Sequence, residues 1–153
     1  MGSQQILLLV LGAIIIAVST AGAIGLFKQN LVSENRKAIL SDLQQMAAHA
    51  NAYYKAPLNV GGGGRLWVPK VNGVYQGNRC GLWLNYAGYE EHNSGDTFIT
   101  DNGTFLMWIN SYTDDVLKIE GTGTEIGRDG ENPVKARMKL TGATGQIEFT
   151  VLN

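Results

Sequence analysis

The sequence has little of what most enzymes and nucleic-acid-binding proteins need. It holds two histidines and one cysteine, and no spacing among its polar residues matches a nucleophile–base pair, so we expect no enzymatic activity and no cofactor. Twelve Lys and Arg against thirteen Asp and Glu give a net charge of −1, so we expect no nucleic acid as a partner. The lone cysteine, Cys80, excludes an internal disulfide.

Charge and proline are also absent from the first part of the chain. No charged residue occurs before Lys28, and no proline occurs before Pro57. Residues 6–27 form an apolar run of 22 residues. As a helix rising ~1.5 Å per residue, this run is long enough to cross the ~30 Å hydrocarbon core of a bilayer.

The helical pattern continues past the apolar run without a turn signal. From Lys28 on, apolar residues recur at intervals of three, four and seven, which predicts an amphipathic helix. Pro57 disfavours helical geometry in Ala56, so the helix should end near residues 54–55. The stripe expected to pack on the C-terminal domain consists of Val32, Ile39, Leu43, Met46, Ala50 and Tyr53.

We therefore divide the chain into residues 1–27 (apolar helix), 28–55 (amphipathic continuation) and 56–153 (β-rich head). A helix of some fifty residues would be ~75 Å long. A head of about a hundred residues is too small to bury such a rod. The apolar half must therefore pack on other chains.

Two alternative interpretations of the N-terminal run bear on its topology. Ala21-Gly22-Ala23 matches a signal-peptide cleavage pattern, but no basic residue precedes the run and the run is longer than 7–15 residues, so we favour a retained helix. The first cations, starting at Lys28, follow the run, and the positive-inside rule would then place the C-terminal side in the cytoplasm. A short basic leader removed before Met1 would resolve this conflict.

The remainder of the chain predicts β structure rich in turns. Sixteen of the 20 glycines follow residue 60, beginning with a four-glycine loop at residues 61–64. Strict apolar–polar alternation in the last two segments predicts an antiparallel hairpin buried on one face. The expected strands are residues 65–68, 82–86, 97–100, 104–109, 116–120, 134–140 and 146–152. The fold class is α+β, with the long N-terminal helix packed across a small antiparallel sheet.

This arrangement resembles that of type IV pilins and pseudopilins. The residue-level motif lies in Met1-Gly2-Ser3-Gln4-Gln5-Ile6-Leu7-Leu8-Leu9-Val10. Pilins begin with a hydrophobic, often N-methylated residue and carry Glu at the fifth mature position. Gln5 stands there in this chain; it can accept a hydrogen bond but carries no charge, so we expect docking to a neighbour's terminal amine to be weaker or to be achieved differently. The apolar run also has no proline, so the resemblance is to a divergent member. Archaeal pilins also have an apolar N-terminal helix, and a resemblance to them is an open alternative.

The resemblance implies a subunit of a cell-surface filament that serves adhesion, attachment or motility and resides in the inner membrane before assembly. Its implied partners are further copies of itself, the pilus assembly machinery, a prepilin peptidase and surface glycans. Small residues at every fourth position would let helices approach closely. The implied subunit-packing residues are Met1, Gln5, Ile6, Leu9, Ala13, Ala17, Ala21 and Gly25. Two alternatives stay open: a membrane-anchored extracytoplasmic binding domain, and a pseudopilin of a secretion system.

Other polar motifs have simpler interpretations. Asn102-Gly103-Thr104 is an N-glycosylation sequon within a predicted turn, and Asp114-Asp115 is a second predicted turn. Glu90-Glu91-His92 with Asp96 lacks metal-ligand spacing, so we expect no metal. Candidate O-glycosylation sites in Gly-rich turns are Thr122, Thr124, Thr141 and Thr144. Aromatic residues expected in the core or at subunit contacts, rather than as sugar sites, are Trp67, Tyr75, Trp83, Tyr86 and Tyr89.

Overall fold

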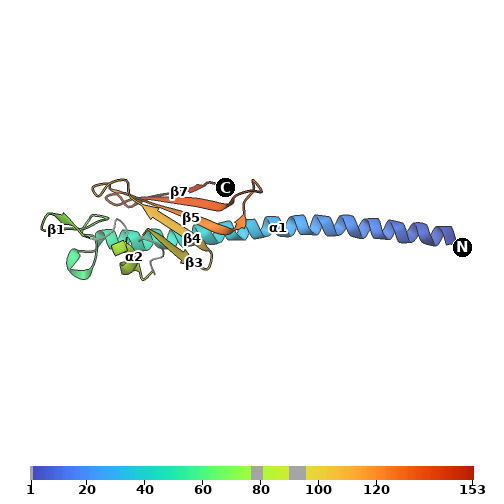
Figure 1. The fold of residues 1–153 in the computed structure, drawn as a ribbon, viewed down its shortest axis with the longest axis horizontal. Coiled ribbons are helices and arrows are strands. Elements are labelled where there is room, and N and C mark those ends of the chain that lie inside the picture. Colours follow the sequence, from blue (N-terminus) through green and yellow to red (C-terminus); the bar gives the residue numbers. More distant parts are fainter. Residues whose placement is uncertain (1, 77–80, 90–95) are drawn as a thin grey trace.

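The computed structural model describes residues 2–76, 81–89 and 96–153 and shows an α+β fold (Figure 1). A long N-terminal helix is followed by a head that contains a five-stranded antiparallel sheet and a two-stranded hairpin. The elements are α1 (Gly2–Lys55), the 3-10 turn η1 (Leu58–Val60), β1 (Lys70–Val71), β2 (Val74–Tyr75), α2 (Gly81–Ala87), β3 (Thr97–Thr100), β4 (Gly103–Trp108), β5 (Val116–Ile126), β6 (Pro133–Thr141) and β7 (Gln146–Val151).

Helix α1 is continuous over 54 residues, which corresponds to ~80 Å. Gly12, Gly22 and Gly25, where the helix could have unwound, lie within it without a break. The helix ends at Lys55, as predicted, because Pro57 adopts an extended conformation with φ −70° and ψ 156°.

The main sheet is a simple meander in which strands β3 to β7 are neighbours in chain order. Cross-strand pairing of Met107 with Ile119, and of Ile119 with Met138, places these side chains on one face. All three are buried, and α1 crosses this face (Figure 1). The predicted closing hairpin of β6 and β7 and the packing of the helix across the sheet are thus confirmed.

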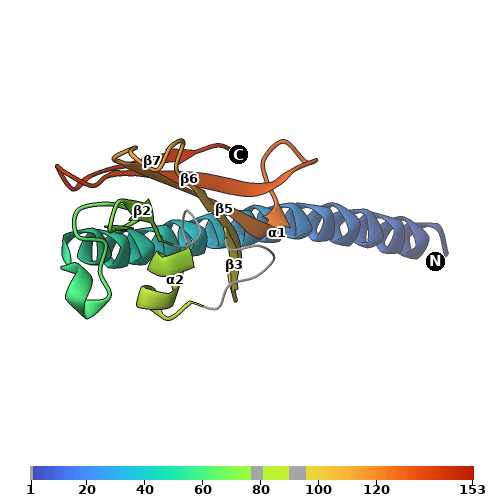
Figure 2. The same cartoon turned by 60° about the vertical axis from the view of Figure 1, so that its left-hand side comes forward.

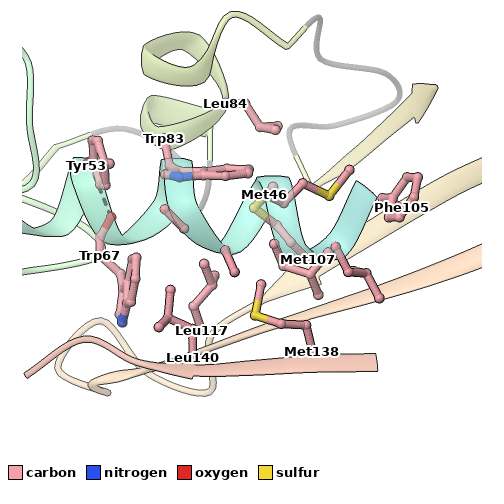
Figure 3. Packing of buried hydrophobic residues seen from close by; sticks show 14 of the residues in the cluster. Met46, Tyr53, Trp67, Trp83, Leu84, Phe105, Met107, Leu117, Met138 and Leu140 are labelled. Carbon is pink, nitrogen blue, oxygen red and sulfur yellow. Dashed lines mark hydrogen bonds between the residues drawn. The ribbon is translucent and has the colours of Figure 1, made fainter. Parts of the chain in front are cut away.

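The core lies on both sides of the second half of α1. Figure 2 shows the sheet on one side of this helix and α2 on the other. In the close view of Figure 3, Trp83 and Leu84 of α2 extend toward α1, and Met138 faces the helix from the sheet. The helix is therefore the central layer of the head.

Two predicted strands are wrong. Residues 82–86 belong to α2, where the adjacent residues Trp83 and Leu84 are both buried, which strand alternation does not allow. Residues 65–68 form a loop that folds back on the end of α1. The N–H groups of Gly63 and Arg65 donate to the carbonyls of Tyr53 and Tyr54, at 2.8 Å each. The four-glycine loop thus caps the helix.

Strand β5 is longer than predicted and runs through two glycines to Ile126. A Cβ at Gly121 would lie 2.8 Å from Ile39 Cγ2, and one at Gly123 would collide with Asn35 Oδ1. The glycines therefore allow α1 to approach the sheet and do not form a turn. Thr122 and Thr124 consequently lie in a strand, which corrects their predicted placement in a Gly-rich turn.

The apolar residues of β7 are more exposed than the alternation predicts. Ile147, Phe149 and Val151 pair with buried residues of β6 and so share the inner face of the sheet. Each nevertheless keeps 38–46% of its surface exposed. The reason is that β7 is an edge strand and extends beyond the part of the sheet that α1 covers.

Candidate assembly surface

The first half of α1 has no partner within the chain. Of residues 2–31, all but the half-buried Gly12 are exposed, and this part of the helix extends away from the head (Figure 1). Leu9 is 74% exposed and Phe27 is 63% exposed. Among the described residues, α1 is the one helix long and apolar enough to cross a membrane, and it could anchor the chain there.

The implied subunit-packing residues lie along this bare half. Gln5 and Ile6 are exposed near the N-terminus, while Met1 lies outside the described residues. The small residues every fourth position, from Ala13 to Gly25, are also exposed. A Cβ added at Gly22 or Gly25 would meet nothing within 4 Å. The isolated chain therefore gives no steric reason for glycine at these positions.

The second half of α1 carries the predicted stripe into the head. Its residues are fully or almost fully buried, except the first, which is half-buried where the helix leaves the sheet. The buried positions are Ile39, Leu43, Met46, Ala50 and Tyr53, and the half-buried one is Val32. Ile39 is the first fully buried residue of the helix, so the bare half begins within two turns before it.

Polar contacts fix the direction in which the bare half leaves the head. Asn35 donates from Nδ2 to the carbonyl of Asn102 at 3.3 Å, and its Oδ1 accepts from the N–H of Glu125 at 3.4 Å. Two turns further along the helix, Asp42 accepts from Thr100 Oγ1 at 2.8 Å and from Asn102 Nδ2 at 3.0 Å. These contacts hold α1 at the β3–β4 turn and at β5.

A third polar contact attaches the C-terminal end of α1 to the head. The Tyr54 hydroxyl donates to Asp115 Oδ1 at 2.6 Å, and the same carboxylate accepts from the N–H of Ala143. Burial, followed by the hydrogen bond and the charge of Asp115, raises the pKa of Tyr54 to about 12. The predicted turn at Asp114-Asp115 thus joins the helix to the β6–β7 turn.

Sequence reasoning missed these polar anchors. Asn35 and Asp42 are seven residues apart on the helix, next to the apolar stripe that contains Ile39 and Met46. Two polar residues at the edge of an otherwise apolar face were a usable signal. Their partners were not predictable, because Asn102 and Glu125 are distant in the sequence.

The predicted glycosylation sites have distinct surroundings. The Asn102 side-chain nitrogen, which a glycan would occupy, donates to both oxygens of Asp42, and modification of the folded head would remove at least one of these bonds, because a glycosylated amide keeps a single N–H. Thr124 and Thr144 are exposed, while Thr122 and Thr141 are half-buried. Thr141 is the last residue of β6, where it pairs with Gln146, which corrects its predicted placement in a turn. Glycosylation of any of these residues stays a prediction.

The remaining candidates from the sequence are the acidic motif near residue 90, the cysteine and the aromatic residues. Glu90-Glu91-His92 and Cys80 lie outside the described residues, and in the described part of the chain no group of three metal-ligating side chains comes together. Trp67 and Trp83 are buried in the core. They are therefore inaccessible to sugars.

Comparisons with family models, with curated proteins and with solved structures find no match to this chain. The pilin resemblance accordingly stays a proposal. The features that bear on function are the exposed apolar half of α1 and its continuity with the half that is buried in the head.

Proposed function

We propose that this chain is the structural subunit of an extracellular type IV pilus-like filament that serves adhesion, surface attachment or motility. The apolar half of α1 first spans the inner membrane and then packs with the same segment of other copies in the filament core. One observation carries this proposal: the bare apolar half and the buried half are a single unbroken helix. A tether that only anchors a domain has no need of this rigid continuity.

The exposed apolar surface requires a partner in either state. Large apolar patches are unfavourable in water, and the exposed run from Ile6 to Phe27 is much longer than a surface patch of a soluble monomer. Lipid covers it before assembly. Outside the membrane, identical helices are the partners that offer an equally long apolar surface.

Polymerisation follows from the geometry of such a contact. If one part of a helix packs against a different part of its neighbour's helix, the interface is heterologous and can repeat without closing, which yields a helical filament. The small residues from Ala13 to Gly25 allow close helix approach. Because Gln5 is neutral, we expect shape rather than charge pairing to dominate docking.

The proposal is tested by placing charge within the bare half. We expect Ile15→Asp or Ala17→Arg to abolish fibres in the sheared cell-surface fraction, since a charge in an apolar helix bundle is costly. Head stability, measured by thermal unfolding in detergent, should stay at the wild-type value. Val74→Asp is the matched control, because Val74 is 63% exposed on β2 at the opposite end of the head, and it should leave the fibres intact.

Other results would contradict the filament proposal or favour one of its two alternatives. Normal fibres from both bare-half variants would contradict packing through α1. Wild-type chain found only as discrete particles in detergent extracts would instead favour a membrane-anchored binding domain, and particles bound to secretion machinery would favour a pseudopilin.

A further inference from the structure

A groove lies where the bare half of α1 meets the head. It is formed by residues 28–36 of α1 and residues 125–130 at the end of β5 and in the loop that follows, and its volume is about 920 Å³. We call it the exit groove. In Figures 1 and 2, the β5–β6 loop lies beside α1 at the end of the head nearest the bare helix.

Unpaired cations surround the exit groove. Lys28, Arg36 and Arg128 line it, against a single carboxylate, Glu125. Among the described residues, none of the three cations has an ion pair or a hydrogen bond, and Arg36 Nε is buried without a partner. The groove therefore has an excess of positive charge and suits an anion.

Apolar side chains lie beside the cations. Leu31 and Ile126 are 39% and 48% exposed, and both line the groove together with the half-buried Val32. A site with cations on one side and aliphatic side chains on the other fits an amphipathic anion better than a free inorganic one.

The β5–β6 loop presents Arg128 in an ordered conformation. The neighbouring Asp129 accepts from the N–H of Asn132 at 3.0 Å, from Asn132 Nδ2 at 2.7 Å and from the N–H of Glu131 at 3.1 Å. The hydrogen bonds from Asn132 hold the pKa of Asp129 well below its usual range, so this carboxylate stays charged and keeps the loop closed.

The position of the groove relative to a bilayer identifies the anion. The apolar run ends at Phe27, so Lys28 to Val32 lie within roughly 8 Å of the hydrocarbon core, in the headgroup layer. Arg36 lies about one turn beyond Val32. Side chains in a helix tilt toward its N-terminus, which favours a position of the Arg36 guanidinium on the membrane side of its own Cα. All of the cations can then reach a lipid phosphate.

We propose that the exit groove binds the phosphate of one anionic phospholipid while α1 spans the membrane. Lys28, Arg36 and Arg128 surround the phosphate. The aliphatic side chains of Leu31, Val32 and Ile126 contact the glycerol and the first carbons of the acyl chains. The inference rests on the membrane-anchored stage of the proposed function, and it does not require a filament.

A second copy of the chain fits this groove less well. The segment of a neighbour that would pass here in a filament is its bare apolar helix, and the first acidic residue of the sequence is Glu34. The bare half therefore carries no negative charge that could pair with three cations. A lipid phosphate supplies that charge.

Lipid retention by the purified full chain tests this proposal. The chain is held in neutral detergent with equal amounts of phosphatidylglycerol and phosphatidylcholine, and bound lipid is counted by native mass spectrometry. We expect one phosphatidylglycerol to be retained preferentially. Arg36→Gln and Arg128→Gln should each weaken its retention about fivefold, which corresponds to ~1 kcal/mol per cation. The triple variant with Lys28→Gln should show no lipid preference.

Matched controls separate this site from general charge effects. Lys37→Gln removes a cation of the same helix that pairs with Glu34 at 2.8 Å, and Lys70→Gln removes one from β1; both should bind lipid as the wild type does. Thermal unfolding of every variant checks that the head is folded. Arg128 lies on an exposed loop, so Arg128→Gln keeps the test valid even if Arg36→Gln unfolds.

Three results would overturn the proposal. The first is equal retention of both lipids by the wild type. The second is displacement of the lipid by inorganic phosphate at equal concentration, which would define a general anion site. The third is an unchanged lipid preference in the triple variant; if that variant also forms no fibres, the groove is a subunit interface instead. Because the assay uses monomer in detergent, failure of the filament proposal would leave it unaffected.

Discussion

Ile39 of α1 lies directly over Gly121 of β5. A Cβ at Gly121 would fall 2.8 Å from Ile39 Cγ2 and 2.6 Å from Phe105 Cε1. A Cβ at Gly103, on the neighbouring strand, would collide with the backbone oxygen of Thr122 and would also lie 2.9 Å from Ile39 Cδ1. The two glycines set how closely the helix approaches the sheet. Ile39 is also the first fully buried residue of α1, and the bare half begins about two turns before it.

We predict that Gly121→Ala destabilises the head by about 1–3 kcal/mol, because the added methyl group overpacks a site that has no free space. Denaturant-induced unfolding of the full chain in detergent measures this change. Gly12→Ala is the control, because a Cβ there meets nothing within 4 Å, and it should not lower head stability. Wild-type stability of Gly121→Ala would refute the close contact.

The same contact predicts coupling between Ile39 and Gly121. Ile39→Ala alone should cost about 2–5 kcal/mol, since it leaves a cavity in the core. It also removes Cγ2, one of the two nearest atoms that block a methyl group at position 121, the other being Cε1 of Phe105. The double variant should therefore be less destabilised than the sum of the single variants. Strict additivity in this cycle would mean that the two residues do not touch.

Alkaline pH should unfold the head partly through Tyr54. Its pKa is raised to about 12 in the folded chain, against 10.0 for a free tyrosine, so the folded state favours the neutral phenol. This contribution is fully present below pH 10 and is lost as the pH rises through about 12. Melting temperatures measured across this range should fall more steeply in the wild type than in Tyr54→Phe. Identical alkaline profiles for the two proteins would refute the assignment.

The Asp42 carboxylate should stabilise the attachment of α1 to the β3–β4 turn. We expect Asp42→Ala to lower the free energy of unfolding by about 1–3 kcal/mol, because it leaves Thr100 and Asn102 without their acceptor. Asp101→Ala, an exposed neighbour in the same turn, should change stability by less than about 0.5 kcal/mol. Equal effects of the two substitutions in denaturant titrations would show that Asp42 makes no special contact.

A larger apolar residue tests close helix packing without adding charge. Gly22→Leu should leave the monomer folded, since the space around Gly22 is open, and the change from Gly improves helix propensity. In a filament, however, the added side chain would separate packed helices. We therefore expect loss of fibres with normal amounts of chain in the membrane. Val18→Leu, a small change of volume on the same helix, is the control. If the control also lost its fibres, the loss in Gly22→Leu would not be evidence for close helix packing at Gly22.

The long helix and the closing hairpin were predictable because each has a local cause. The apolar run at residues 6–27 and the periodic stripe that follows it predict one continuous helix, and Pro57 ends it. Alternation in β6 and β7 predicts their pairing. In these segments the spacing of the hydrophobic residues is enough to predict the secondary structure without knowledge of the tertiary contacts.

The errors have tertiary causes. Gly121 and Gly123 were expected to form a turn, but they lie in β5 because α1 passes close above them. Trp83 and Leu84 were assigned to a strand, but they belong to a short helix that packs on the side of α1 opposite the sheet. Of the cations of the exit groove, Lys28 and Arg36 lie on the same helix, whereas Arg128 is distant in the sequence and is brought beside α1 only by the loop after β5.

Electron microscopy of sheared cell-surface material, prepared without detergent and with this chain identified by mass spectrometry, tests the filament proposal most directly. The proposal predicts thin, uniform fibres in which the apolar half of α1 forms the core and the heads lie outside. Recovery of the chain only from detergent-extracted membranes, as discrete particles without fibres, would contradict it.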